Sequence, residues 1–410
     1  MHDMKDSGVE WIGEIPAHWS PIRFRFIAKI TTGNQDTQNA DPDGEYPFYV
    51  RSPIVERCNN YTFDGKGILM AGDGAGAGRV FHLVDGKYAV HQRVYRFYDF
   101  KYMDPVLLKY YLENLFATVM DYGSAKTTVP SVRLPMIQDF VVCVPPKKEQ
   151  DNIVAVLNEK CAQVGSLISN VQAQIEKLKA YKQSLITEVV TKGLDPTVLM
   201  KDSGVEWIGE IPKHWSVIPS KFLFANCDER RREGDVQLTA SQKYGMISQE
   251  EYMRRENARI VLADKGLENW KHVEPFDFVI SLRSFQGGLE MSEVTGCATW
   301  HYIILRARQR IHPYYYKWLF KSSMYITTLQ RTCNYIRDGQ DLRYSNFVKV
   351  PLCIPTLYEQ QKIADFLDRK CAKIDHLITL KQSKIEKLEQ YKRSLIYEYV
   401  TGKREVSCDE

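Results

Sequence analysis

The stretch MKDSGVEWIGEIPAHWS, residues 4–20, occurs twice in this chain and decides its architecture. It returns as residues 200–216 with one change, Ala17 to Lys213. A match of this length within one chain indicates an internal duplication. Such a repeat determines the domain architecture, so it is considered before the local sequence patterns. We call these two stretches the lead segments.

A second repeated block, P-x-x-x-E-Q-x-x-I-x-x-x-L, follows each lead segment at a distance, at residues 145–157 and 355–367. From residue 4 to 200 the offset is 196, and from residue 145 to 355 it is 210, so the second intervening stretch is 14 residues longer. The intervening blocks, residues 21–144 and 217–354, show no obvious alignment with each other. We therefore predict four segments: 1–144, 145–199, 200–354 and 355–410.

Apolar residues after each P-x-x-x-E-Q block recur in alternating steps of three and four, which predicts two long amphipathic helices. The first series is Val154, Leu157, Cys161, Val164, Ile168, Val171, Ile175, Leu178, Leu185 and Val189. The second is Ala364, Leu367, Cys371, Ile374, Ile378, Ile385, Leu388, Leu395 and Tyr399. Lys182 and Lys392 interrupt the two series at matching positions, and Lys381 is a further break. Prolines precede both helices, and Gly193 and Gly402 follow them as C-terminal signals.

Each helix could pack on its own globular domain, or the two could pack on each other. Their matched registers favour mutual packing, and an internal pseudo-two-fold would set them antiparallel. The expected fold is α+β, with two globular domains separated by an antiparallel intramolecular coiled coil. About 36 residues at 1.5 Å each would make a rod of about 54 Å. Two DNA-reading domains held apart in this way could dock about one helical turn apart, near 34 Å.

Each intervening block mixes short β-like runs with a helical stretch. Val141–Val144 and Phe278–Leu282 read as buried strands, and Pro105–Met120 and Pro313–Leu329 read as helices. Polar loops between them carry the candidate DNA-contacting residues: Arg79, Lys126, Thr127, Arg283, Ser284, Gln286, Arg337, Gln340 and Arg343. Arg and Gln suit bidentate contacts to guanine and adenine, whereas Lys, Ser and Thr suit phosphate. The alternative is that these are ordinary solvated loops.

The charge balance and the cysteine spacing limit the classes of protein to which this chain could belong, but they do not identify one. The net charge is +4, and residues 217–354 hold 20 Lys+Arg against 15 Asp+Glu, so a basic face would need local sorting of charge. The nine cysteines form no C-x-x-C pair and no metal-ligand spacing, which favours reduced thiols in a cytoplasmic protein. We expect no membrane span, no secretory signal and no metal site.

Three short patterns suggest an enzyme. Phe63–Gly67 fits the F-x-G-x-G pattern of methyl-donor binding sites. Such sites are accompanied by a catalytic tetrapeptide, in which Asp, Asn or Ser is followed by two prolines and an aromatic residue, and the chain has no such tetrapeptide. Gly72–Arg79 resembles a phosphate-binding loop but lacks the G-K-[S/T] ending. Asp43, Asp64 and Lys66 imitate a nuclease metal site. A stand-alone nuclease or methyltransferase, and a coiled-coil protein adaptor, therefore remain as alternatives.

The repeated motifs resemble those of the specificity subunits of type I restriction–modification systems. The motifs in question are G-x-x-P-x-H-W at residues 13–19 and 209–215, and P-x-x-x-E-Q-x-x-I at 145–153 and 355–363. Thr356 in place of Pro146 is a minor departure. The resemblance spans nearly the whole chain.

The resemblance implies a non-catalytic subunit of a restriction endonuclease and adenine methyltransferase complex. Residues 21–144 and 217–354 would be two target recognition domains, each reading one half of a bipartite, asymmetric site in double-stranded DNA. The helices would set the spacing and dock two methyltransferase subunits, and nuclease-translocase subunits would join them. S-adenosylmethionine, ATP and Mg²⁺ would belong to those partners, with no cofactor in this chain.

Overall fold

The computed structural model describes residues 3–123, 130–259, 263, 265–281, 284–332 and 342–406, with no side chains at 119–123 and 285. The chain divides into two compact units. Unit 1 comprises Met1–Gln172 and Gln382–Glu410, and unit 2 comprises Ala173–Lys381. Each unit thus contains one intervening block and a part of both long helices.

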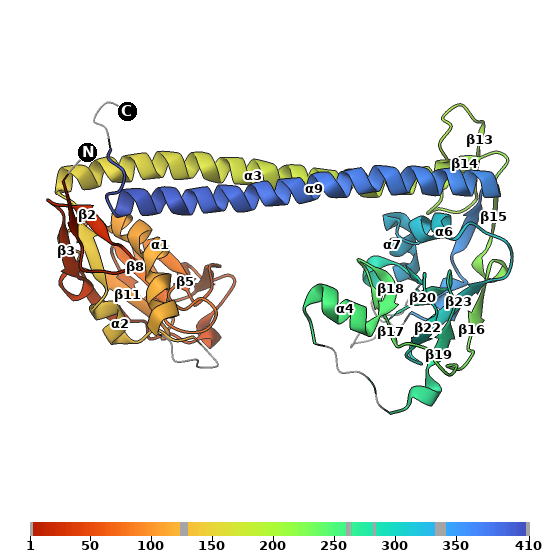
Figure 1. Ribbon diagram of the computed structural model, residues 1–410, viewed down its shortest axis with the longest axis horizontal. Coiled ribbons are helices and arrows are strands. Elements are labelled where there is room, and N and C mark those ends of the chain that lie inside the picture. The colour runs from red at the N-terminus through yellow and green to blue at the C-terminus, as the bar shows by residue number, and fades with distance from the viewer. Residues whose placement is uncertain are drawn as a thin grey trace. The chain divides into compact units, whose positions relative to one another are not determined.

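Unit 1 is built around a four-stranded antiparallel sheet with strand order β4-β11-β8-β9 (Lys29–Thr32, Val94–Tyr98, Gly67–Ala71, Phe81–Val84). The middle strand β8 reads GILMA and is buried throughout, because it is covered on both faces. A second sheet has the order β6-β5-β10-β7 (Glu56–Cys58, Tyr46–Tyr49, Lys87–Val90, Phe63–Asp64). Helix α1 (Pro105–Gly123) packs near β8 and β9, and α2 (Leu134–Gln138) precedes β12 (Figure 1).

Unit 2 contains a sheet of the same order, β16-β23-β20-β21 (Phe224–Cys227, Ile303–Ala307, Phe278–Ile280, Glu290–Met291). Two-stranded ladders join β17 to β18 (Leu238–Ser241, Gly245–Ser248) and β19 to β22 (Lys271–Val273, Gly296–Ala298). The short helices are α4 to α8 (Gln249–Glu256, Ser284–Gly287, Pro313–Leu319, Ser323–Arg331, Tyr344–Phe347). The two blocks therefore contain the same central sheet although their sequences do not align.

Both units have the same frame around that sheet. The lead segments form the hairpins β1–β2 (Met4–Asp6, Glu14–Pro16) and β13–β14 (Met200–Asp202, Glu210–Pro212). The strand after each lead segment pairs with the last strand of its block, β3 with β12 (Ser20–Arg23, Val141–Val144) and β15 with β24 (Ser216–Pro219, Pro351–Ile354). Single 3-10 turns follow at Phe24–Phe26 and Ser220–Phe222, and others lie at Thr37–Asn39 and Leu267–Asn269. Each block is thus closed by pairing of its two ends.

The long helices are α3 (Lys147–Lys192) and α9 (Leu357–Val400), and they lie side by side in each unit (Figure 1). In unit 1 the start of α3 (Ile153, Leu157, Cys161) shares a buried core with the end of α9 (Leu395, Ile396, Tyr399). In unit 2 the end of α3 (Ile186, Val189, Val190) shares one with the start of α9 (Ile363, Leu367, Cys371). The two helices therefore pair antiparallel, and each also packs on the globular part of both units.

The sequence patterns locate most of these elements correctly, and the differences have local causes. Gly193 and Gly402 take positive φ angles of 78° and 72°, the left-handed conformation that ends a helix. The helix expected over Pro313–Leu329 is interrupted, because Ser322 takes an extended conformation and its hydroxyl donates to Leu319 O at 2.8 Å. The strand expected over Phe278–Leu282 ends at Ile280. Within the described ranges, no helix combines the length and apolar character needed to cross a membrane.

Candidate nucleic-acid interface

The first lead segment is bound to the start of α3 through one glutamate. Glu149 lies in the first turn of the helix, where a carboxylate is favoured by the helix dipole. Its Oε2 accepts a hydrogen bond from Trp19 Nε1 at 2.9 Å, and its Oε1 lies 2.6 Å from His18 Nε2. The repeated His-Trp dipeptide is thus explained by a two-point contact with the helix start.

Unit 2 repeats this joint with Glu359 in the first turn of α9. His214 Nε2 lies 2.8 Å from Glu359 Oε1, and Trp215 Nε1 donates to the same oxygen at 3.0 Å. Thr356 donates to Oε2 from its hydroxyl at 2.7 Å and from its backbone N–H at 3.0 Å. Burial alone would raise the pKa of Glu359, but the hydrogen bonds from Trp215, Thr356 and His214 outweigh it and leave that pKa lowered.

The glutamine after each glutamate binds the intervening block itself. Gln150 Oε1 accepts from Asp104 N at 2.7 Å, directly before α1, while its amide donates to Pro145 O at 2.8 Å. Gln360 does the same in unit 2, accepting from His312 N at 2.8 Å directly before α6 and donating to Pro355 O at 2.9 Å. The repeated Glu-Gln pair therefore fixes both the lead segment and a block helix to the long helix.

The second tryptophan of each lead segment, Trp19 or Trp215, also packs against the end of the other long helix. A methyl group added at Gly402, after α9, would lie 3.2 Å from Trp19 Cη2 and 2.3 Å from Pro16 Cδ. One added at Gly193, after α3, would lie 3.3 Å from Trp215 Cζ2. Each joint thus holds the start of one helix, the end of the other and one block together.

In unit 1, the predicted contact residue Arg79 is exposed at the end of the glycine-rich turn, with its backbone N–H bonded to Gly76 O at 3.0 Å. The turn borders a hollow of about 640 Å³ that Arg51 and Asp73 also line. Arg51 pairs with Asp73 at 2.9 Å, and Arg93 approaches the same carboxylate at 3.7 Å. The sequence interpretation missed these two arginines, because only the fold brings them to the turn.

In unit 2, the predicted residue Gln286 is exposed and lines a cleft of about 690 Å³ between the β17–β18 turn, α5 and α3. Gln242 and Lys243 of that turn also line it, together with Lys182 of α3. A methyl group at Gly287 would lie 2.5 Å from Gln242 Cδ, so the Gln242 side chain lies directly against this glycine. Gln242 and Lys243 were missed, although the polar S-Q-K-Y-G turn between two β-like runs is a signal for them.

Of the other predicted contact residues, two lie within the described residues and five lie outside them. Ser284 is only 1% exposed, and its hydroxyl accepts from Ser281 N at 2.8 Å, so in this structure it stabilises the turn. Arg343 is exposed before α8, with its backbone N–H bonded to Asn346 Oδ1 at 3.0 Å. Five candidates lie outside the described residues: Lys126, Thr127, Arg283, Arg337 and Gln340. Contact of any of these residues with DNA stays a prediction.

Charge at the unit 2 cleft is partly neutralised within the protein. Lys321 and Glu290 form a buried ion pair, and Lys321 Nζ also donates to Gly287 O at 2.9 Å. Burial raises the pKa of Glu290 and lowers that of Lys321, while their attraction opposes both shifts.

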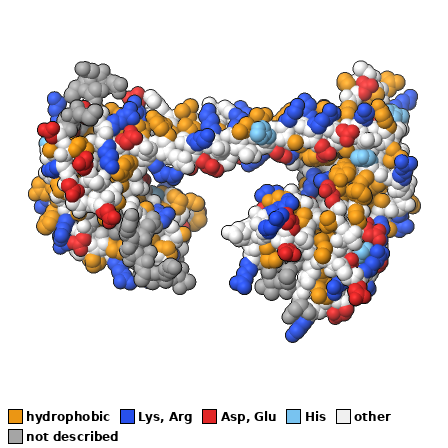
Figure 2. Space-filling model, in the orientation of Figure 1, with side chains coloured by type: hydrophobic (Ala, Val, Ile, Leu, Met, Phe, Trp, Pro, Cys, Tyr) orange, Lys and Arg blue, Asp and Glu red, His pale blue; other side chains and the backbone are white. Residues whose placement is uncertain are grey.

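On α4, hydrogen bonds from Arg254 and Arg255 lower the pKa of Glu251 to about 2. Figure 2 shows basic and acidic side chains mixed over the visible face of both units.

The residues of the methyl-donor pattern have another role in unit 1. Phe63 lies in β7, and its ring faces the guanidinium of Arg96 at 4.6 Å. Arg96 is buried and donates from Nε to the Tyr88 hydroxyl at 2.7 Å. This pattern is therefore accounted for by cation–π packing between the two sheets of unit 1.

Comparison with known proteins identifies a domain family. Residues 16–177 match the family model described as the type I restriction modification DNA specificity domain. The chain is 28% identical over 180 residues to the type I restriction enzyme EcoDI specificity subunit of Escherichia coli, covering 43% of this chain and 38% of that one. It is 27% identical over 220 residues to the MjaVIII specificity subunit of Methanocaldococcus jannaschii, covering 50% and 49%. The matches thus span about half or less of these relatives' lengths.

A solved structure has the same fold. It is titled as the structural basis of complex assembly and conformational transition of the type I R-M system. The TM-score is 0.67 at 14% identity, and the alignment covers 95% of this chain and 99% of that chain. Residues 16–177 thus match a type I restriction modification DNA specificity domain, and the chain as a whole has the fold of this solved structure.

Proposed function

We propose that this chain is the non-catalytic, DNA-reading subunit of a type I restriction–modification enzyme, in which each block reads one half of a bipartite, asymmetric site. One observation carries the proposal: the same frame and sheet order occur twice, but each copy presents different polar side chains. Two readers with different surfaces recognise two different half-sites. A duplicated enzyme would instead be expected to repeat its chemical groups, and the block residues are not repeated.

The chemistry of the two surfaces suits base reading. The unit 2 cleft presents Gln242, Gln286 and Lys243. Glutamine pairs bidentately with adenine in the major groove, and lysine binds guanine or phosphate. The glycine-rich turn of unit 1 presents Arg79, with Arg51 beside it. Arginine pairs bidentately with guanine, so we infer that the two half-sites differ in base composition.

We further propose that the long helices set the gap between the half-sites. Helix α3 has 46 residues, ten more than the apolar series predicted. At 1.5 Å per residue it is about 69 Å long. The joints at Glu149 and Glu359 fix each block to the helix pair through charged hydrogen bonds on both sides. A block fixed in this way follows the helix, so helix length would determine the separation of the bases that are read.

Matched exposed apolar residues on the helices support docking of two copies of one partner. Leu167 of α3 and Leu377 of α9 occupy equivalent repeat positions and are 50% and 45% exposed. Tyr181 and Tyr391 are equally matched, at 56% and 54% exposure. We propose that two methyltransferase subunits bind there and that nuclease-translocase subunits join them. S-adenosylmethionine, ATP and Mg²⁺ would be bound by those subunits.

Selection from a random DNA library tests this function, with the full chain bound to its methyltransferase partner. The expected result is two short, unlike half-sites at a fixed gap, with affinity that falls steeply as salt rises. Replacing residues 21–144 by the corresponding block of another family member should change one half-site and leave the other. A single continuous site would refute bipartite reading, and affinity independent of salt would favour the protein-adaptor alternative.

A further inference from the structure

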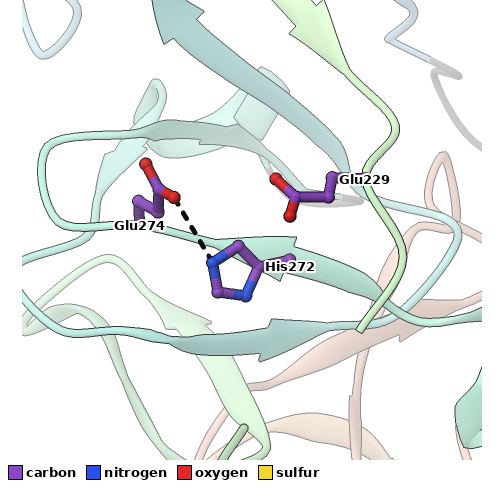
Figure 3. Close-up of side chains that lie close together, drawn as sticks. All are labelled: Glu229, His272 and Glu274. Atoms are coloured by element: carbon purple, nitrogen blue, oxygen red, sulfur yellow. Dashed lines mark ion pairs between the residues drawn. The ribbon is translucent and has the colours of Figure 1, made fainter. Parts of the chain in front are cut away.

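Three side chains of unit 2 converge at one place outside the cleft (Figure 3). They are Glu229 from the loop after β16, His272 from β19 and Glu274 directly after β19. One ligand atom from each, the imidazole nitrogen and two carboxylate oxygens, lies within 4.8 Å of the others. Nitrogen and carboxylate oxygen are ligands that bind divalent transition metals in proteins.

One ring nitrogen of the histidine contacts a carboxylate on the side away from the two glutamates. His272 is 1% exposed, and its Nδ1 lies 2.8 Å from Oδ2 of the equally buried Asp235. With the carboxylate accepting a proton from Nδ1, a metal-bound ring would present the lone pair of Nε2 to the two glutamates. This carboxylate–histidine arrangement is the usual outer support of a metal-bound imidazole.

The other ring nitrogen lacks a partner that would satisfy it. Within the described part of the chain, His272 Nε2 is buried and has no hydrogen-bond partner. The nearest carboxylate oxygen, Glu274 Oε1, lies 3.6 Å away, too far for a hydrogen bond. A lone pair that faces carboxylate oxygens is electrostatically unfavourable unless a cation or a proton lies between them.

The local charge leaves room for such a cation. Among the described residues, the ion-pair network at this site contains four carboxylates and two guanidinium groups, a formal charge of −2 without the histidine: Glu229, Asp235, Glu274 and Asp277, with Arg232 and Arg306. Arg306 binds Asp277 most closely, with Nε–Oδ1 at 2.9 Å and Nη2–Oδ2 at 2.7 Å, and its Nη1 makes longer contacts of 3.4 Å with Oε2 of Glu229 and Oε2 of Glu274. Arg232 contacts both glutamates but is half exposed, so it can move aside.

We propose that Glu229, His272 and Glu274 bind one divalent transition metal of the Zn²⁺ class, a proposal that departs from the sequence expectation of no metal site. The metal would connect the loop that follows β16 to strand β19. That loop leads into β17 and so to the Gln242–Lys243 turn of the cleft. The site is therefore structural, and it does not depend on the proposed DNA-reading function.

Metal titration of the full chain tests this site. Chelator-treated, dialysed protein is titrated with Zn²⁺ in competition with a chromophoric chelator, and separately with Co²⁺ while its visible absorption is recorded. The test variants are His272→Ala, Glu229→Gln and Glu274→Gln, and the matched controls are His301→Ala and Glu250→Gln, both exposed. Circular dichroism shows which variants are folded, and the isosteric Glu→Gln changes decide the matter if His272→Ala does not fold.

The wild type and both controls should bind one more Zn²⁺ per chain than the three test variants, or bind it at least tenfold more tightly. The melting temperature should rise with Zn²⁺ only in the proteins that keep the site. Equal Zn²⁺ stoichiometry and affinity in all folded proteins, with the same Co²⁺ spectrum, would overturn the proposal. That outcome would assign the space beside Nε2 to a proton or to Arg232 and leave the DNA-reading function intact.

Discussion

The indole nitrogen of Trp19 donates a hydrogen bond of 2.9 Å to Oε2 of Glu149, across 130 residues of sequence. The same relationship joins Trp215 to Glu359 in the second copy at 3.0 Å. These two bonds connect the most closely repeated parts of the chain, the lead segments and the helix starts. Both parts of this contact therefore recur in each copy, although the blocks between them do not align.

Glu149→Ala removes the acceptor of both Trp19 and His18 and should lower the free energy of unfolding by about 1–3 kcal/mol. The indole N–H of the buried Trp19 is left unsatisfied, which adds to the cost of the lost bond. Glu359→Ala should have a similar effect in unit 2. Urea unfolding of the full chain measures both. The control Glu389→Ala, at an exposed position of α9, should change the free energy of unfolding by less than about 0.5 kcal/mol. An equally small effect of Glu149→Ala would contradict the joint.

The lowered pKa of Glu359 predicts a dependence of stability on acid pH. The ionised carboxylate is favoured in the folded state, so its stabilisation is complete above the unfolded pKa of about 4.3 and is lost as pH falls through the lower folded value. Wild type should therefore be more stable than Glu359→Gln at neutral pH, and the difference should shrink as pH falls below about 4. Urea unfolding from pH 7 to pH 3 checks this. A stability difference between wild type and Glu359→Gln that grows toward low pH would contradict a lowered pKa of Glu359 in the folded state.

The lysine that interrupts the first apolar series has a partner across the helix pair. Lys182 Nζ lies 2.7 Å from both carboxylate oxygens of Asp375. A double-mutant cycle with Lys182→Ala and Asp375→Ala should give a coupling energy of about 0.2–1 kcal/mol that falls as salt rises, because Asp375 is exposed. Zero coupling at low salt would mean that the two side chains do not meet in solution.

Gln286→Ala should weaken binding to one half-site by about 1–3 kcal/mol, because a bidentate contact to a base is lost. Competition binding with DNAs that carry substitutions in either half-site measures the effect. Gln309→Ala, an exposed glutamine that does not line the cleft, is the matched control. Equal weakening on every DNA sequence would make Gln286 a phosphate contact instead.

Repeated features were the part of the fold that sequence could predict. The lead segments, the helix starts and the terminal glycines each occur twice, and caps and heptad steps are short-range patterns. The common sheet order of the two blocks could not be predicted from their sequences. A strand requires only that apolar residues face the core, and many unrelated sequences meet this requirement. Ser322 breaks an otherwise helical pattern through a backbone conformation that its residue type does not reveal.

The candidate surfaces were only partly predictable, for a related reason. Gln286 was found because it follows a β-like run in a polar loop. Gln242 and Arg51 were missed, since tertiary packing brings them beside Gly287 and Asp73. Ser284 has the residue type of a contact, but its hydroxyl is used inside the turn. Residue type thus suggests candidates, and packing decides which of them face outward.

Lengthening both helices equally tests the central claim most directly, namely that the helix pair sets the gap between two half-sites. Lys381 of α9 contacts Gln174 of α3, so the two helices can be extended at opposing positions by inserting one heptad after each of these residues. Seven residues add about 10 Å, equivalent to about three base pairs. With the methyltransferase partner bound, affinity is measured on DNAs that differ only in the gap. The preferred gap should lengthen by about three base pairs with both half-sites unchanged, whereas an unchanged preferred gap would contradict the account.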